Sequence, residues 1–394
     1  MEMLLWFLLP VAAASGWIAA RRSARGAAPP KPIYDNNPDY FRGLNYLLNE
    51  EPDKAIDVFV QLLEVDSETV ETHLALGSLF RRRGEVERAI RIHQNLIARP
   101  ALSREQRAQA LLELGQDYMR AGLFDRAENL FKELREMKIH LKPALRNLRL
   151  IYQQERDWDA CLSVTEALQP LVGEDLGPER AHYYCELAKT ALERRQHGQA
   201  EGLLRKALAA DRRCTRAMHM QAAMASARGD YREAIRGLLR AADTDPDYFP
   251  ELLPDLIEAH KRLGDLAGLR SYFEQRMARQ PTAALELALA DIVKDSEGER
   301  AAVAYLSERV RSAPSLKGLL KLVEYHGCGS DAAADDVLIG LREHIDRLLH
   351  ERPQYQCTRC GFSAKTLHWQ CPSCRSWGSF KRRPEIEECL QVNP

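Results

Sequence analysis

One stretch of the chain decides its fold: residues 216–246 read RAMHMQAAMASARGDYREAIRGLLRAADTDP. The small side chains of Ala222 and Ala225 lie three residues apart, which suits a helix that packs closely against a neighbour. Gly229 interrupts this helical pattern, and a second helical pattern follows it. Pro246 closes the unit, because proline cannot continue a helix. The stretch therefore predicts a helix–turn–helix unit.

The same arrangement recurs along the chain with a period of about 34 residues. Gly77 follows Gly43 by 34 residues, and Gly115 follows Gly77 by 38, which implies a four-residue insertion. Five alanines occupy the matching slot of the second helix: Ala55, Ala89, Ala127, Ala200 and Ala234. An isolated match would be an ordinary amphipathic helix pair, but five units that align in this way do not arise by chance. The unit resembles the tetratricopeptide repeat (TPR), which implies an all-α superhelical solenoid.

The composition limits the class of protein. The 394 residues are 29% charged and 45% hydrophobic, which excludes a disordered chain and a multi-span membrane protein. The formal net charge is −1, and this balance argues against nucleic acid as the main partner, because phosphate binding requires a basic excess. Cys161, Cys185 and Cys214 fall at helical repeat positions, which predicts buried thiols and a reducing compartment.

Residues 1–20 read MEMLLWFLLPVAAASGWIAA and carry one charge, at Glu2. As a helix this segment would be roughly 30 Å long, enough to cross a bilayer. Arg21 and Arg22 follow it, so the positive-inside rule places the rest of the chain in the cytoplasm. A cleaved signal peptide is the alternative, but such peptides carry their positive charge before the apolar stretch. We expect an uncleaved transmembrane anchor and a Pro-rich linker over residues 21–35.

We expect the repeat array to extend over residues 36–350, with about eight to nine units. Seven units are predicted to begin near Asn36, Val70, Ser103, His140, Arg180, Thr215 and Asp247. After Thr282 the pattern decays, although residues 284–309 and 315–350 remain amphipathic, with a turn at 327–335 between them. These stretches predict one or two degenerate units, which are usual where one face of a solenoid must be capped.

In the repeat family that the chain resembles, the first helices of successive units line a groove that binds peptides or helices of other proteins. By this resemblance the partner-binding residues are Tyr40, Leu44 and Leu47 in the first unit, and Leu74, Ser78 and Arg81 in the second. Each of these side chains could equally face solvent without a partner. Arg81–Arg83 also form a cationic helix C-terminus, which complements the helix dipole without any ligand.

Residues 351–394 carry a motif of a different kind. It reads Cys357-Thr-Arg-Cys360 and then Cys371-Pro-Ser-Cys374, which is Cys-x2-Cys-x10-Cys-x2-Cys. Two thiolates separated by two residues can point at one ion from a tight turn, so the motif predicts a closed tetrahedral site for one Zn or Fe ion. It resembles a rubredoxin-type knuckle or a zinc ribbon. Arg375 stands where rubredoxins usually have glycine, which leaves iron and zinc both open.

Four aromatic side chains near the cysteines are expected to form a hydrophobic shell around the ion: Phe362, Trp369, Trp377 and Phe380. His368 could replace a ligand, although a loop position without a metal role is the simpler interpretation. Two redox-active Cys-x-x-Cys pairs are the alternative, but the sequence lacks the strand and helix pattern that usually flanks them. Lys381–Arg383 are expected to face solvent or to dock onto acidic repeat residues, rather than to bind phosphate groups of RNA or lipid.

Catalysis is not expected. Four thiolates leave no open coordination position on the ion for hydrolysis. The chain also lacks a phosphate-binding glycine loop, an HExxH motif and a GxSxG nucleophile motif. A binding protein or scaffold is the better interpretation of a solenoid without such motifs.

The order of these parts is itself informative: an apolar anchor, a proline linker, a TPR-like array and a four-cysteine module. Over its full length the chain resembles the lipopolysaccharide assembly protein B family (LapB, also YciM) of Gram-negative inner membranes. The resemblance implies an adaptor that brings the deacetylase LpxC to the membrane protease FtsH for degradation. It also implies an opposing membrane sensor of the PbgA/YejM type, and a single-pass inner-membrane protein whose bulk faces the cytoplasm.

Two other functions are compatible with the same sequence. A passive scaffold would coordinate lipopolysaccharide assembly proteins without changing the lifetime of a client. An electron-transfer protein would use an iron-filled knuckle as its redox centre. The sequence leaves open which repeat faces bind which partner, and whether the chain forms a homodimer.

Overall fold

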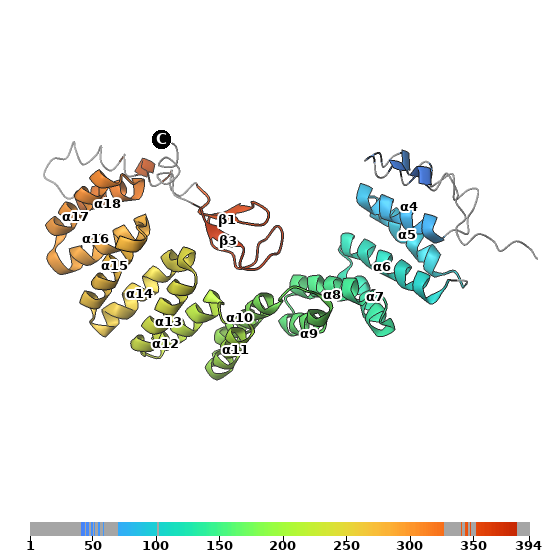
Figure 1. The fold of residues 1–394 in the computed structure, drawn as a ribbon, viewed down its shortest axis with the longest axis horizontal. Coiled ribbons are helices and arrows are strands. Elements are labelled where there is room, and N and C mark those ends of the chain that lie inside the picture. Colours follow the sequence, from blue (N-terminus) through green and yellow to red (C-terminus); the bar gives the residue numbers. More distant parts are fainter. Residues whose placement is uncertain are drawn as a thin grey trace, which may run out of the picture. The chain divides into compact units, whose positions relative to one another are not determined.

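The computed structural model describes residues 70–100, 102–326 and 352–383, with isolated residues between 41 and 58 and between 340 and 347. In these residues the chain forms a series of paired helices followed by a small β-sheet (Figure 1). The chain divides into two compact units, residues 1–144 and residues 145–394. The predicted helical repeat solenoid with a small C-terminal module is confirmed for the described part of the chain.

The described part of the first unit contains two helix pairs. α4 (Val70–Arg83) packs against α5 (Val86–Ile97), and α6 (Arg104–Arg120) packs against α7 (Phe124–Met137). α5 also packs against α6, so the two pairs form one stack. α6 begins at a capping box, in which the Ser103 hydroxyl accepts from the Gln106 amide and the Gln106 side chain accepts from the Ser103 amide.

Close packing within each pair explains the glycine slot of the repeat. A Cβ atom on Gly77 would lie 2.4 Å from the His93 ring, and one on Gly115 would lie 2.6 Å from the Phe131 ring. Atoms in a packed interior do not approach this closely, so only glycine fits at both positions. The alanine slot is equally strict, because all five predicted alanines are fully buried: Ala55, Ala89, Ala127, Ala200 and Ala234.

The second unit continues the series of helices. α8 (Leu141–Glu155) crosses the boundary between the units. It is followed by α9 (Trp158–Leu168), the 3-10 helix η1 (Gln169–Leu171), α10 (Gly177–Glu193), α11 (His197–Ala210), α12 (Thr215–Ala227) and α13 (Tyr231–Thr244). Next come η2 (Pro246–Tyr248), α14 (Phe249–Leu263), α15 (Leu266–Arg279), α16 (Ala283–Glu297), α17 (Glu299–Ser312) and α18 (Leu316–His326). From α9 onward each α-helix packs against the next.

The helix–turn–helix unit predicted for residues 216–246 is confirmed as α12 and α13, joined at Gly229 with a φ of 81°. Arg156 and Arg195, each at a φ of 60°, occupy the left-handed region in the turns that follow α8 and α10. Residues 284–309, predicted as amphipathic helix, form the pair α16 and α17, which Gly298 separates. The predicted turn at 327–335 lies outside the described residues.

The C-terminal module, residues 355–382, is built on a three-stranded antiparallel sheet in the order β2-β1-β3. Its strands are β1 (Tyr355–Cys357), β2 (Ser363–Ala364) and β3 (Phe380–Arg382). Tyr355 pairs with Ala364 on one side and with Arg382 on the other. The sheet places the first cysteine at the end of its central strand.

In the part of the chain that the structure describes, no helix is both long enough and apolar enough to cross a bilayer. The predicted anchor at residues 1–20 and the predicted linker at residues 21–35 lie outside this part. Both remain predictions.

Candidate metal centre and its docking surface

Two turns of similar backbone shape carry the four cysteines. In the first, the Gly361 amide donates to the Cys357 carbonyl at 2.9 Å, and in the second the Arg375 amide donates to the Cys371 carbonyl at 2.9 Å. Gly361 has a φ of 76° and Arg375 a φ of 58°, so both residues occupy the left-handed region. Arg375 therefore keeps the backbone shape of the turn, although its side chain makes this conformation more costly than it is for glycine.

The turns bring four thiols to one point. The Sγ atoms of Cys357, Cys360, Cys371 and Cys374 lie within 4.8 Å of one another, and the 357–374 and 360–371 pairs are each 3.6 Å apart. Tetrahedral Zn–S bonds of about 2.3 Å require sulfurs about 3.8 Å apart, so the cluster fits one ion. It is the one group of three or more potential ligands found in the described residues, and His368 is not part of it.

The thiols differ in how readily they ionise. Burial opposes ionisation of Cys357, but hydrogen bonds from Ser379 and from the backbone amides of its turn lower its pKa to about 6. A hydrogen bond from Ser376 also lowers the pKa of Cys374. Burial raises the pKa of Cys371 to about 11. Because metal ligands are thiolates, an arriving ion has to displace the proton of Cys371.

The aromatic shell expected around the ion is only partly present. Phe380 is buried in the module core with Tyr355 and two of the cysteines. The edge of Phe362 contacts Phe380, although Phe362 is 40% exposed. The prediction is wrong for Trp369 and Trp377, which pack against the repeat helices instead. A module with so few core residues leaves large indole rings at its surface, where the helices cover them.

Trp377 lies among rings from α9 and α10. It contacts Trp158 and Tyr183 edge-on, with ring centroids 5.8 Å away in both cases. Its ring stacks on His182, and Trp158 stacks on Tyr183 at 5.9 Å. Burial, together with the charge of Arg216, lowers the pKa of His182 to about 3, so this ring is neutral at ordinary pH and packs as an aromatic group. Trp158, His182, Tyr183 and Trp377 are called the aromatic cluster below.

Trp369 makes a second contact with the repeats. Its ring centroid lies 5.1 Å from that of Tyr248, the last residue of η2, which precedes α14. The guanidinium carbon of Arg216 lies 5.5 Å from the same indole, within the range of a cation–π interaction. Arg216 is held by Glu186 of α10 at 2.8 Å. Trp369 therefore joins the module to α12 and to the segment before α14.

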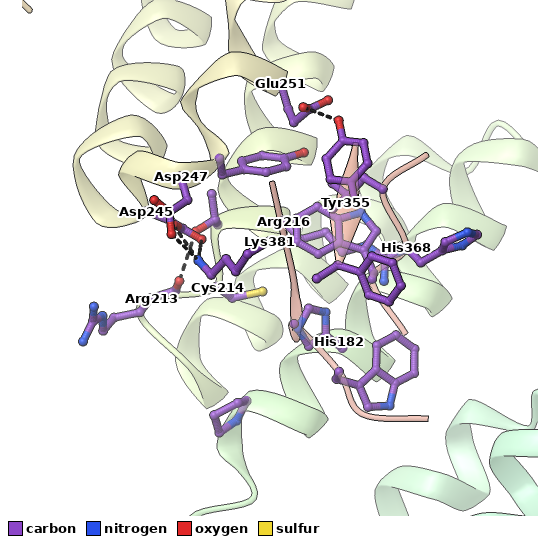
Figure 2. Close-up of a pocket in the computed structure, with 18 of the residues that line it drawn as sticks. His182, Arg213, Cys214, Arg216, Asp245, Asp247, Glu251, Tyr355, His368 and Lys381 are labelled. Carbon is purple, nitrogen blue, oxygen red and sulfur yellow. Dashed lines mark hydrogen bonds and ion pairs between the residues drawn. The ribbon is translucent and has the colours of Figure 1, made fainter. Parts of the chain in front are cut away.

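Polar pairs surround these rings: Lys381 with Asp245 and Asp247, Tyr355 with Glu251, and Gln370 with Gln153 (Figure 2 shows the first two groups). The Lys381 ammonium lies 2.9 Å from the Asp245 carboxylate and 3.3 Å from that of Asp247. The prediction that the basic C-terminal residues dock onto acidic repeat residues is thus confirmed for Lys381. Contacts of the module extend from α8 to α14.

Sequence reasoning did not find the repeat residues that hold the module. These residues lie on three different helices, α10, α12 and α14, and no sequence pattern relates them to the cysteines: His182, Tyr183, Arg216 and Glu251. One weak signal was present: His182, Tyr183 and Tyr184 place three rings in succession where the first helix of a repeat usually has small residues.

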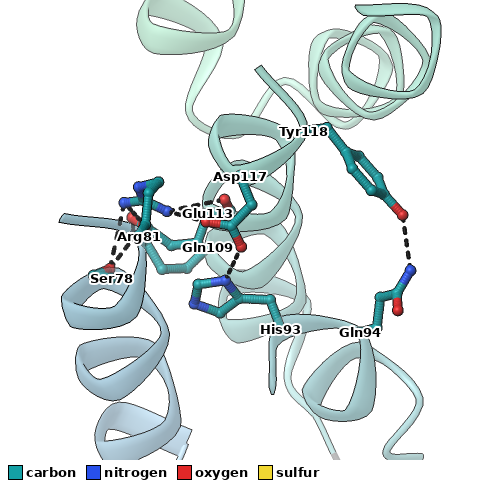
Figure 3. Close-up of polar contacts among 8 residues, drawn as sticks. All are labelled: Ser78, Arg81, His93, Gln94, Gln109, Glu113, Asp117 and Tyr118. Carbon is teal, nitrogen blue, oxygen red and sulfur yellow. Dashed lines mark hydrogen bonds and ion pairs between the residues drawn. The ribbon is translucent and has the colours of Figure 1, made fainter. Parts of the chain in front are cut away.

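The predicted partner-binding residues lie in the first unit. Ser78 donates to Glu113 at 3.0 Å, and Arg81 pairs with Glu113 at 2.5 Å and with Asp117 at 2.7 Å (Figure 3). Asp117 is fully buried and also contacts His93 at 2.5 Å. Ser78 and Arg81 thus connect α4 to α6 of the next pair. Of the others, Leu74 is half-buried on α4, and Tyr40, Leu44 and Leu47 lie outside the described residues.

Known proteins share both parts of this architecture. Residues 355–382 match a family model described as a rubredoxin metal binding domain, and residues 72–108 and 185–249 match tetratricopeptide repeat models. A protein of Escherichia coli (strain K12) named lipopolysaccharide assembly protein B is 39% identical over 379 residues, which cover 96% of this chain and 97% of that protein. A protein of the same name from Haemophilus influenzae is 34% identical over 393 residues, with the same coverage.

Two solved structures match part of this chain. YrrB, a TPR protein with an unusual peptide-binding site, is 16% identical with a TM-score of 0.35, over 52% of this chain and 97% of that chain. The complex of Naa15/Naa10 with HypK-THB gives 15% identity and a TM-score of 0.45, over 79% of this chain and 46% of that chain. Sequence identities and TM-scores this low do not allow a function to be assigned to this chain.

Proposed function

Because this chain belongs to the lipopolysaccharide assembly protein B family, we propose that it is an adaptor that promotes degradation of the deacetylase LpxC by the membrane protease FtsH. A scaffold role in lipopolysaccharide assembly follows from the family and the repeats. The finer proposal names the client, the protease and the consequence for the client. It also treats the chain as a non-enzymatic protein of the bacterial inner membrane, held there by residues 1–20.

The docking of the metal module onto the repeats carries this proposal. Four cysteine sulfurs converge, so an ion bound there has no open position for a substrate. Trp369 and Trp377 fix the module to helices of four successive repeat units. A Zn or Fe ion at this site would hold the module folded, and the module would in turn brace the helices that it touches. This arrangement suits a protein that presents a fixed surface to others.

The anchor and the groove have separate roles in the proposal. Residues 1–20 restrict the array to the membrane, which raises its effective concentration near FtsH without any added contact. The first-helix face, with Tyr40, Leu44, Leu47 and Leu74, receives LpxC or the protease. A sensor of the PbgA/YejM type opposes the adaptor through the membrane-proximal region. A homodimer would place two such faces at one protease.

The test is the lifetime of LpxC after translation is stopped, in cells with and without this chain. We expect the lifetime to lengthen when the chain is removed, and to be restored by the intact chain but not by one that lacks residues 1–20. An unrelated apolar span in place of residues 1–20 is the matched control, because it restores tethering alone. An unchanged lifetime of LpxC would contradict the adaptor and favour a passive scaffold.

One observation favours a second function. Cys360 and Cys374 are exposed, and an exposed ligand sulfur lets an iron site exchange electrons with a partner. If the chain is an electron-transfer protein, the purified protein carries iron, is red and bleaches reversibly on reduction. A colourless protein that carries zinc after purification from iron-replete cells would exclude this function.

A further inference from the structure

Two buried thiols of the repeat helices lie next to each other. Cys185 is on α10, and Cys214 is the N-cap residue of α12, 29 positions further along the chain. Their sulfur atoms are 4.0 Å apart, and both are free thiols. A disulfide places its sulfurs about 2.05 Å apart, so each sulfur would have to move by only about 1 Å to form one. Neither the four-cysteine metal site nor the proposed client surface uses this pair.

The two thiols differ in how completely they are covered. Cys185 has no exposed surface, whereas Cys214 is 5% exposed. Cys214 is also one of the residues that line a cavity of about 240 Å³ between the metal module and the repeat helices α10, α12 and α14 (Figure 2). A cavity of this size has room for several water molecules, and hydrogen peroxide is little larger than water. An oxidant that reaches the pair through this cavity therefore meets Cys214 first.

The two thiols also differ in how readily they ionise. A hydrogen bond from the Cys185 thiol lowers the pKa of Cys214, and a backbone hydrogen bond from Ala217 acts in the same direction, against burial. The same hydrogen bond, together with burial, raises the pKa of Cys185 well above its ordinary value. Cys214 is thus the sulfur that reacts as a thiolate, and Cys185 is the neighbour that keeps its proton. Cys161 is the contrast, because burial raises its pKa to about 12.

We propose that Cys185 and Cys214 form a reversible disulfide when the chain meets a peroxide, and that this bond clamps α10 to the start of α12. In the reducing compartment that the sequence predicts, the pair remains two thiols until peroxide rises. The inference goes beyond the proposed adaptor function and does not depend on it.

The reaction has two steps. The Cys214 thiolate attacks one oxygen of hydrogen peroxide, the O–O bond breaks, and the other oxygen leaves as hydroxide, which takes up the proton that Cys214 lost. The Cys185 sulfur then attacks the sulfenic acid on Cys214, so that the S–S bond forms and the S–O bond breaks. The proton of Cys185 leaves with the departing hydroxide as a second water. Two thiols and one peroxide thus give one disulfide and two waters, and a small dithiol reverses the change by exchange.

The bond would join the two helices that hold the metal module. His182 lies one helical turn before Cys185, and Arg216 follows Cys214 by two residues. The side chains of His182 and Arg216 both contact indole rings of the module. A bond between the two sulfurs also encloses all of α11 in a covalent loop. Oxidation should therefore hold this part of the docking surface in place.

The test treats the folded, metal-loaded chain in detergent with increasing hydrogen peroxide. Remaining thiols are alkylated, and the digested peptides are identified by mass spectrometry. We expect the Cys185 peptide to be joined to the Cys214 peptide, lighter by two hydrogen atoms than the separate peptides, and to be released by dithiothreitol. In Cys185→Ala, the sulfenic acid on Cys214 should persist and be trapped by dimedone. Cys161→Ala is the matched control, because it removes another fully buried repeat thiol and should keep the linked peptide.

The measurement on the wild-type chain does not depend on how the variants fold, and two results would overturn the proposal. In the first, peroxide oxidises the four metal-site cysteines while Cys185 and Cys214 both remain open to alkylation. In the second, Cys214 is linked to several cysteines in similar amounts. That scatter is the pattern expected when the chain is oxidised in guanidinium chloride, where any of its nine cysteines can meet.

Hydrogen exchange tests the clamp. Peptides of α11 should exchange at least about tenfold more slowly in the linked chain than in the reduced chain, because the closed loop has less freedom when it opens. Peptides of α4–α7 should not change. Peroxide-treated Cys185→Ala, which cannot form the bond, controls for oxidation elsewhere and should show no slowing. Equal exchange of α11 in the linked and the reduced chain would overturn the clamp.

Discussion

The indole ring of Trp377 lies nearly parallel to the imidazole of His182, with 5.1 Å between ring centroids and 21° between ring planes. Trp377 belongs to the metal module and His182 to α10, and each part has its own core. Variants can therefore test the folding of the module and its docking one at a time.

Replacing Trp377 with alanine should release the module without emptying its metal site. The lost ring leaves a gap beside Trp158 and Tyr183, and we expect docking to weaken by about 2–4 kcal/mol. The four sulfurs are untouched, so metal content should stay unchanged. Limited proteolysis between α18 and β1 measures release of the module, and metal analysis measures the occupancy of its site. Phe362→Ala removes an exposed ring and is the control, and a Trp377→Ala variant that resists protease like the wild type would contradict the docking role.

Replacing Cys371 with serine should empty the metal site, and docking of the module should be lost as a consequence. The buried sulfur is lost, and we expect the metal to be released and the module to unfold. Hydrogen exchange should then accelerate in the peptides that contain His182 and Tyr248, which the module covers, and not in α4–α7. Ser373→Ala, in the same turn, is the control. Full metal content in Cys371→Ser would rule out a site of four thiolates.

Acidification should weaken the docked state through His182. Its pKa is lowered from 6.5 to about 3, so in this range the unfolded chain binds a proton that the folded chain excludes. Stability is full above pH 6.5 and falls as the pH decreases below it, by up to about 1.4 kcal/mol per pH unit. Unfolding free energies of wild type and His182→Phe, measured across this range, should diverge, because phenylalanine keeps the ring and cannot bind the proton. Metal release at low pH affects both proteins, so parallel curves would contradict the prediction.

Two glycine substitutions should change the free energy of unfolding in opposite directions. Gly77→Ala places a methyl group 2.4 Å from His93, and overpacking of this kind costs about 1–3 kcal/mol. Gly202→Ala lies within α11 with no atom nearby, so the higher helix propensity of alanine should stabilise the chain by about 0.5–1 kcal/mol. Chemical denaturation of both variants checks the signs. A neutral Gly77→Ala would show that His93 can move away.

Arg375→Gly should strengthen the second turn of the metal site. Arg375 adopts a φ of 58°, a conformation that costs an L-residue about 1–2 kcal/mol and glycine almost nothing. We expect slower loss of metal to a chelator from Arg375→Gly than from the wild type. Gly361→Ala, in the equivalent position of the first turn, should lose metal faster. The reverse order would mean that the arginine side chain stabilises the turn by contacts of its own.

The repeat array was predictable because its constraints are local and recur. Gly77 must be glycine because His93 packs on it from the partner helix, and Gly115 meets Phe131 in the same way. The cysteine motif was predictable because its constraint is also local: each Cys-x2-Cys pair lies within one short turn. The docking surface was not predictable. An indole near four cysteines can cover the ion or face outward, and only the fold brings Trp377 to Tyr183.

The contact between Gln370 and Gln153 joins residues 217 positions apart in sequence. During synthesis the repeats emerge first, and the partners of Trp377 stay uncovered until the last part of the chain is made. A copy interrupted before that point displays an apolar patch that the finished chain hides, and such patches attract chaperones and proteases. Only a chain translated through Trp377 can therefore cover the aromatic side chains of α9 and α10 with the module.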